Sequence, residues 1–142
     1  MKSLVLLLLL FACQPANAQN PVVNPTFPTT GIVASSGNVA AAPAVATLPA
    51  IQGRFTYICG FSITSAGSTG AADVVATVTG LNGGTLSFSY ETVAGANAAN
   101  LPLVIPFTPC MPSSTVNTAV VVTLPSLGTG NTTATVNAWG YQ

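Results

Sequence analysis

The sequence predicts an all-β protein: a single antiparallel β-sandwich or jelly-roll domain, preceded by an extended arm rich in proline and alanine. Apolar and polar residues alternate with period two in several segments of the chain, which is typical of strands with one buried face. Turn sequences rich in glycine and asparagine separate these segments. No segment of the predicted mature chain repeats its apolar residues at the helical period.

The first eighteen residues are predicted to be a secretory signal. Lys2 precedes an apolar run at 4–12, which is too short to span a bilayer, and the small residues at 16–18 favour cleavage after residue 18. An alternative is a lipobox in which Cys13 carries a lipid anchor. Both interpretations place the mature chain outside the cytoplasm, on a periplasmic, extracellular or virion surface where disulfides persist. No membrane span is expected in the mature chain.

Residues 19–52 are predicted to form the extended arm. They carry no charge, and their recurring prolines oppose a continuous helix and favour extended backbone. The segment has room for one strand at 38–48. Two roles remain open, an arm that packs on a neighbouring subunit and a simple spacer. The prolines are Pro21, Pro25, Pro28, Pro43 and Pro49.

The sandwich domain is predicted to cover residues 53–142. Every second residue from Phe55 to Ile63 is large or apolar, which would place Cys59 on the core side of the first strand. Asn82-Gly83 predicts a hairpin, and prolines inside the fourth apolar segment predict an edge strand. Strands are expected at 55–64, 73–79, 85–91, 101–107, 120–124 and 132–139.

Two cysteines remain once the predicted signal is removed. Cys59 and Cys110 form an even pair in a secreted chain, which predicts a disulfide. It would close a loop of about fifty residues and stabilise the fold by at most about 4 kcal/mol. The alternative is two separate buried thiols. A catalytic thiol is disfavoured because the chain has no histidine to activate it.

Charged residues make up only 3% of the chain, against roughly 25% in an average domain. Acid–base chemistry by histidine is therefore excluded, and a hydrolase would have to use Asp73 and Glu91 as its two carboxyls. Zinc and calcium sites need more ligands than the chain offers. Arg54 alone cannot bind a phosphate backbone. We expect no catalytic residues, no metal, no cofactor and no nucleic-acid partner.

Trp139 and Tyr141 are the candidate contact residues. They share one face of the last predicted strand, opposite Ala138 and Gly140. If that face is exposed, the two rings form a platform on which a sugar ring or a partner subunit could stack. The alternative is that they cap the core or lie at an oligomer seam.

The outward strand positions are mostly threonine and serine, so the sheet edges lack the charges that usually keep edges apart. We therefore expect a homo-oligomer. The leading hypothesis is a non-enzymatic, exported structural or attachment protein that self-associates on a cell or viral-particle surface. The alternative is a secreted carbohydrate-binding module that uses Trp139 and Tyr141.

Five segments between residue 37 and the end of the chain carry a resemblance to a known family: 37–40 (GNVA), 54–61 (RFTYICGF), 79–87 (TGLNGGTLS), 128–132 (GTGNT) and 138–142 (AWGYQ). With these segments the region resembles a family of small all-β proteins of tailed phages and prophages. The resemblance implies a virion or surface structural component and assigns no catalytic residue.

A looser resemblance is to chaperone-assembled pilins, which are secreted β-sandwiches with one disulfide, an N-terminal donor strand and a penultimate tyrosine. The similar features are Cys59 and Cys110, the arm that begins at Gln19, Gly128 and Tyr141. This resemblance implies that the arm completes the sheet of a neighbouring subunit by strand addition.

Overall fold

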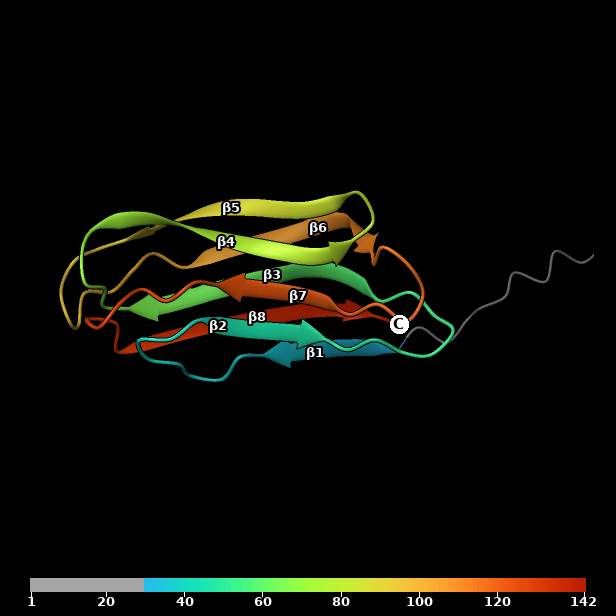
Figure 1. The fold of residues 1–142 in the computed structure, drawn as a ribbon, viewed down its shortest axis with the longest axis horizontal. Helices are drawn as coiled ribbons and strands as arrows, with labels where there is room; N and C mark the ends of the chain where they lie inside the picture. Colours follow the sequence, from blue (N-terminus) through green and yellow to red (C-terminus); the bar gives the residue numbers. More distant parts are fainter. Residues whose placement is uncertain (1–29) are drawn as a thin grey trace, which may run out of the picture.

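This computed structural model describes residues 30–142 of the chain. These residues fold into two four-stranded antiparallel sheets (Figure 1). The predicted signal, Cys13 and residues 19–29 of the predicted arm lie outside the described residues. The strands are β1 (Gly31–Ser35), β2 (Ala44–Leu48), β3 (Tyr57–Ala66), β4 (Ala72–Leu81), β5 (Gly84–Thr92), β6 (Leu103–Pro112), β7 (Val120–Leu124) and β8 (Thr133–Tyr141).

The strand order is that of a jelly roll. Sheet A has the order β1-β8-β3-β6, and sheet B has the order β2-β7-β4-β5. Apart from the β4–β5 hairpin, each connection carries the chain from one sheet to the other, which wraps the two sheets around a shared core. The predicted β-sandwich class is confirmed. The structure also confirms that the proline-containing segment is an edge strand, β6.

The predicted boundary at residue 53 is wrong, because β1 and β2 belong to the two sheets. β1 pairs with β8, with Ile32 opposite Gly140, and β2 pairs with β7, with Ala46 opposite Val122. Pro43 and Pro49 lie just outside β2, so these prolines limit a strand and do not prevent one. The segment predicted as an arm therefore contributes one strand to each sheet, β1 to sheet A and β2 to sheet B.

The core lies between the sheets and follows the period-two pattern. Inward side chains on the central strands are fully buried, whereas Leu86 and Phe88 of the β5 edge and the inward residues of the β6 edge are only half-buried. Burial is therefore less complete along the side of the sandwich where β5 and β6 run (Figure 1). The fully buried residues include Ala44, Ala46, Leu48, Ile58, Phe61, Ile63, Ala76, Val78, Val120, Val122, Leu124 and Val136.

One detail of the predicted pattern is wrong because β3 contains a β-bulge. The register against β8 shifts between Ile58 and Gly60, so that one extra residue, Cys59, is accommodated. A single inserted residue reverses the faces of all residues on one side of it. Phe61 therefore points into the core, while Tyr57 and Cys59 lie on the outer face. The prediction that Cys59 lies on the core side is wrong.

Candidate functional site

The outer face of sheet A carries the two aromatic residues that the sequence singled out. Along β8 the inward residues are buried, with Ala138 only 1% exposed, and Trp139 and Tyr141 alternate with them on the other face. Both aromatic side chains are half-buried. They therefore do not belong to the core, and the alternative in which they cap it is wrong.

A third aromatic residue, Tyr57, joins them. Tyr57 lies opposite Tyr141 in the β3–β8 register, and the two rings stack with centroids 4.7 Å apart and planes 13° from parallel. Phe55, in the loop before β3, lies 6.5 Å from the Tyr57 ring and is 39% exposed. We call Tyr57, Trp139 and Tyr141 the aromatic face. Sequence analysis missed Tyr57 because it overlooked the bulge.

Gly60 determines how the indole of Trp139 lies. The two residues are neighbours across β3 and β8, and a Cβ on Gly60 would lie 2.4 Å from an indole carbon. The absence of a side chain thus lets the indole ring lie close to the β3 backbone at Gly60. On the other side of Trp139 is Val33 of β1, whose side chain is 83% exposed. The aromatic face therefore continues into an exposed apolar residue at the sheet edge.

A row of small polar residues lies beside the aromatic face. Asn137 of β8 has Ser35 of β1 and Ser62 of β3 as its cross-strand neighbours. Within residues 30–142, the side chains of Asn137 and Ser62 make no hydrogen bond, and the Ser35 hydroxyl accepts one from the Gly37 amide. The outer face thus presents an aromatic row and a polar row with free donors and acceptors.

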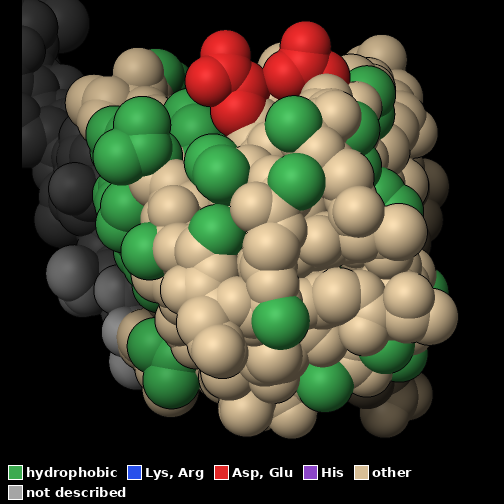
Figure 2. Space-filling model, turned by 90° about the vertical axis from the view of Figure 1, so that its left-hand side faces the viewer, with side chains coloured by type: hydrophobic (Ala, Val, Ile, Leu, Met, Phe, Trp, Pro, Cys, Tyr) green, Lys and Arg blue, Asp and Glu red, His purple; other side chains and the backbone are tan. Residues whose placement is uncertain are grey.

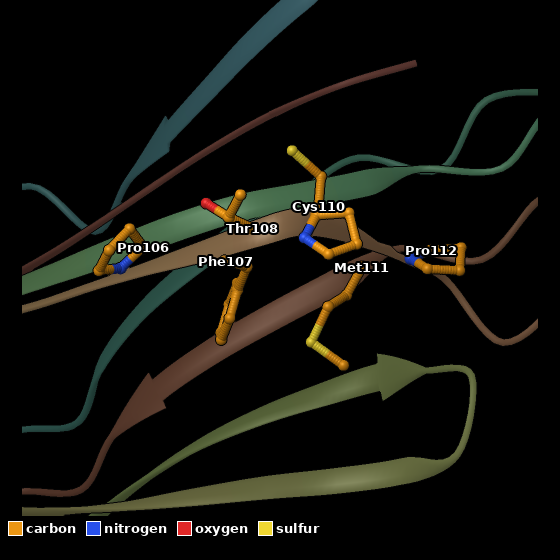
Figure 3. A pocket seen from close by; sticks show the side chains of 7 residues that line it. Pro106, Phe107, Thr108, Cys110, Met111 and Pro112 are labelled. Carbon is orange, nitrogen blue, oxygen red and sulfur yellow. The ribbon is translucent and has the colours of Figure 1, made fainter.

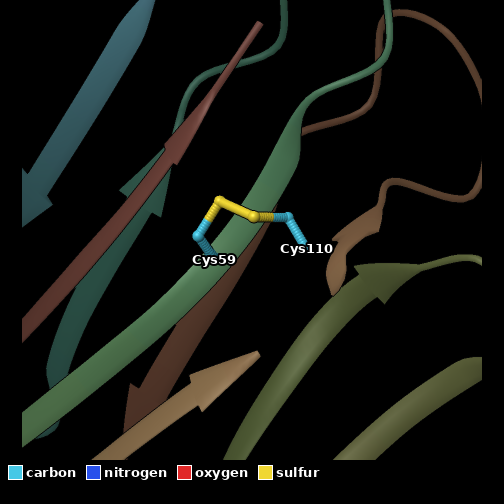
Figure 4. The surroundings of a disulfide bond; sticks show 2 residues. All are labelled: Cys59 and Cys110. Carbon is cyan, nitrogen blue, oxygen red and sulfur yellow. A yellow bond between two sulfur atoms is a disulfide. The ribbon is translucent and has the colours of Figure 1, made fainter. Parts of the chain in front are cut away.

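The predicted disulfide is present and lies on the same outer side. Cys59 and Cys110 are bonded, with their Cα atoms 4.2 Å apart (Figure 4). The bond joins the β3 bulge to the irregular part of β6, where the β3–β6 register also shifts. Cys59 immediately precedes Gly60, so the bond fixes the backbone against which Trp139 rests.

An open depression of about 530 Å³ lies along β6 (Figure 3). It is lined only by residues 106–112. Phe107 and Met111 project toward sheet B, whereas Thr108 and Cys110 project to the other side (Figure 3). No lining residue carries a charge or a free titratable group, because Cys110 is in the disulfide. This depression offers apolar contact and no catalytic chemistry.

The structure brings the two acidic residues together. Asp73 of β4 and Glu91 of β5 are direct cross-strand neighbours, and both are exposed (Figure 2). Catalysis by a carboxyl acid generally needs a desolvating pocket, so their position adds no support to the hydrolase hypothesis. Within residues 30–142 no group of three potential ligand residues is placed to hold a metal ion.

One tyrosine is buried away from the aromatic face. Tyr90 of β5 is 2% exposed, and its hydroxyl lies 2.8 Å from that of Ser65 on β3. The Asn100 amide donates to the same Ser65 oxygen at 2.7 Å. Burial raises the pKa of Tyr90, and the Ser65 hydrogen bond opposes that shift. This network ties the two sheets together and is structural.

Comparison with known proteins adds no assignment. No protein-family model, curated protein or solved structure matches the chain. Among the described residues, none forms a helix long and apolar enough to cross a membrane.

Proposed function

We propose that the chain is a non-enzymatic structural or attachment subunit that is exported and self-associates on the surface of a cell or viral particle. The observation that carries this proposal is the edge strand β5, whose outer side pairs with no other strand of residues 30–142. Its nine residues contain no proline and no basic residue, and Glu91 is its only charged side chain. A long, nearly uncharged edge can pair with a strand of another chain.

The other three sheet edges are protected. β1 and β2 have only five residues each, and short edges offer few backbone groups for pairing. β6 is long, but Pro106, Pro109 and Pro112 lack the amide hydrogens that strand pairing needs. The contrast favours β5 as the edge for association.

The apolar side chains of β5 support the same interpretation. Leu86 and Phe88 point inward but are half-buried, whereas inward residues of the central strand β7, such as Val122, are fully buried. A second β5 strand added along this edge would cover part of that apolar surface. The gain would be about 25 cal/mol for each Å² removed from water.

The predicted signal and the disulfide support export, because disulfides persist mainly in oxidising compartments. The resemblance to phage-associated proteins favours the particle surface, and the predicted signal favours the cell surface.

The test introduces an inward-pointing charge at the β5 edge. In Leu86→Lys the ammonium group of a monomer can reach water, but a second strand would bury it, so we expect the oligomer to dissociate. Ile32→Lys is the matched control. Ile32 is also a half-buried inward residue of an edge strand, but its strand, β1, is an edge of sheet A. Size-exclusion chromatography with light scattering gives the mass of each variant.

The proposal predicts that Ile32→Lys keeps the wild-type mass and that Leu86→Lys lowers it. A cooperative thermal unfolding transition is measured for each variant to establish that it is folded. Equal masses for the wild type and Leu86→Lys, with both folded, would contradict association through β5.

A further inference from the structure

We infer that the aromatic face of sheet A is a binding site for a neutral carbohydrate. This inference goes beyond self-association and does not depend on it, because β5 belongs to the other sheet. The first observation is that three half-buried aromatic side chains lie on the outer surface of a regular sheet. Tyr57, Trp139 and Tyr141 lie on neighbouring positions of β3 and β8, which are the two central strands of sheet A.

The rings are held in place before any ligand binds. Tyr57 and Tyr141 stack on each other, and Trp139 lies against the bare backbone of Gly60. The Cys59–Cys110 bond fixes the strand beneath them. Aromatic side chains with few rotatable bonds and fixed orientations lose little entropy on binding, so this face is suited to a ligand with a flat apolar surface.

The polar row makes a sugar the fitting ligand. Asn137 is two residues from Trp139 on the same face of β8, a separation of roughly 6.8 Å along the strand. Asn137 and Ser62 have side-chain donors and acceptors with no partner in residues 30–142. A pyranose ring stacked on the indole would direct its hydroxyl groups toward these side chains. A purely apolar ligand would leave them unpaired, which is unfavourable.

Charge determines which sugars fit. The charged residues of the described chain are Arg54, Asp73 and Glu91. None of them lies in a strand of sheet A. The strand positions of this face carry hydroxyl, amide and aromatic groups and no charge, which complements a neutral glycan. Arg54, the basic residue of the described chain, lies in the loop before β3.

Trp139 is the only tryptophan in the chain, so its fluorescence reports directly on this face. The probes are neutral oligosaccharides of glucose, galactose, mannose and N-acetylglucosamine, with an oligogalacturonate as the acidic comparison. We expect at least one neutral oligosaccharide to change the tryptophan emission in a saturable manner and the acidic one to have no effect. No response to any neutral probe at millimolar concentration would overturn the inference.

Variants measured by calorimetry then test the residues. We expect Trp139→Ala and Tyr141→Ala to weaken binding by about tenfold or more, because each removes a stacking surface. Asn137→Ala keeps the rings and removes hydrogen bonds, so we expect roughly fivefold weaker binding. Val75→Ala is the control, because Val75 is 49% exposed on the outer face of sheet B, and its affinity should be unchanged.

Two further results would overturn the inference. One is unchanged affinity in Tyr141→Ala and Asn137→Ala, both of which spare the indole packed on Gly60. The other is dissociation of the oligomer by Tyr141→Ala with no glycan bound by the wild type, which would make the face a subunit interface. Leu86→Lys, by contrast, should lose self-association and keep glycan binding. The two proposals can therefore fail separately.

Discussion

At the scale of single residues, Gly60 and Trp139 depend on each other. The indole occupies the space in which a side chain at position 60 would stand, and the Ile105 carbonyl oxygen closes the same space from β6 at 2.7 Å from a Cβ built there. Any other residue must move the ring or the strand. The aromatic face therefore depends on a position with no side chain of its own.

We predict that Gly60→Ala lowers the free energy of unfolding by about 1–3 kcal/mol, the usual cost of overpacking, and shifts the Trp139 emission to longer wavelength. Gly31→Ala is the control, because Gly31 lies opposite Tyr141 in β1 and a Cβ there meets nothing within 4 Å. Urea unfolding followed by fluorescence measures both effects. Equal stability of the two variants would contradict the packing described for Gly60.

Tyr90 makes stability depend on alkaline pH. Burial raises its pKa above the ordinary value of 10.0, so above pH 10 the unfolded chain loses this proton more readily than the folded chain. The contribution of this shift to the free energy of unfolding is fully present below the pKa of Tyr90 in the unfolded chain. It is lost as the pH rises through the pKa of Tyr90 in the folded chain. We predict that the wild type loses stability as the pH rises above about 10.

Tyr90→Phe should reduce this alkaline loss, although the variant also loses the hydrogen bond to Ser65, which costs about 1 kcal/mol at neutral pH. Urea midpoints at both ends of the pH range measure the effect. An alkaline loss of the same size in Tyr90→Phe would show that Tyr90 does not cause it.

At the scale of elements, the sequence predicted regular strands well and their irregularities poorly. The predictions of a hairpin at Asn82-Gly83 and of an edge strand at β6 were correct. Turn residues and prolines restrict the backbone locally, so their effects can be predicted from neighbouring residues alone. The bulge in β3 was missed, since one inserted residue leaves no interruption in an apolar pattern. Gly60 inside the strand was the available signal. β1 was missed because its five residues are short and its partner, β8, lies about a hundred residues later.

The disulfide is a cross-link between two such irregular segments. It closes a sequence separation of 51 residues, so reduction should lower the free energy of unfolding by up to about 4 kcal/mol. A double variant, Cys59→Ser with Cys110→Ser, should match the reduced wild type and should not respond to reductant. Urea unfolding with and without reductant measures this. A wild type whose intact mass does not rise by two hydrogens on reduction would contradict the bond.

At the scale of the whole molecule, the jelly roll has two separate surfaces on which the proposals rest, one on each sheet. Sheet A presents aromatic and hydroxyl groups outward, and sheet B ends in an edge strand with little protection. The period-two pattern was sufficient to predict two packed sheets, because alternation determines which face is buried. It could not predict which strand lies at which edge, because that depends on pairing between distant segments. The β5 edge and Tyr57 therefore emerged only from the structure.

The solution mass of the chain from Gln19 onward tests whether the protein self-associates. The measurement is light scattering coupled to size-exclusion chromatography, repeated over a wide range of protein concentrations. Association through β5 predicts a dimer or larger assembly whose fraction rises with concentration. A monomer at every concentration would contradict it.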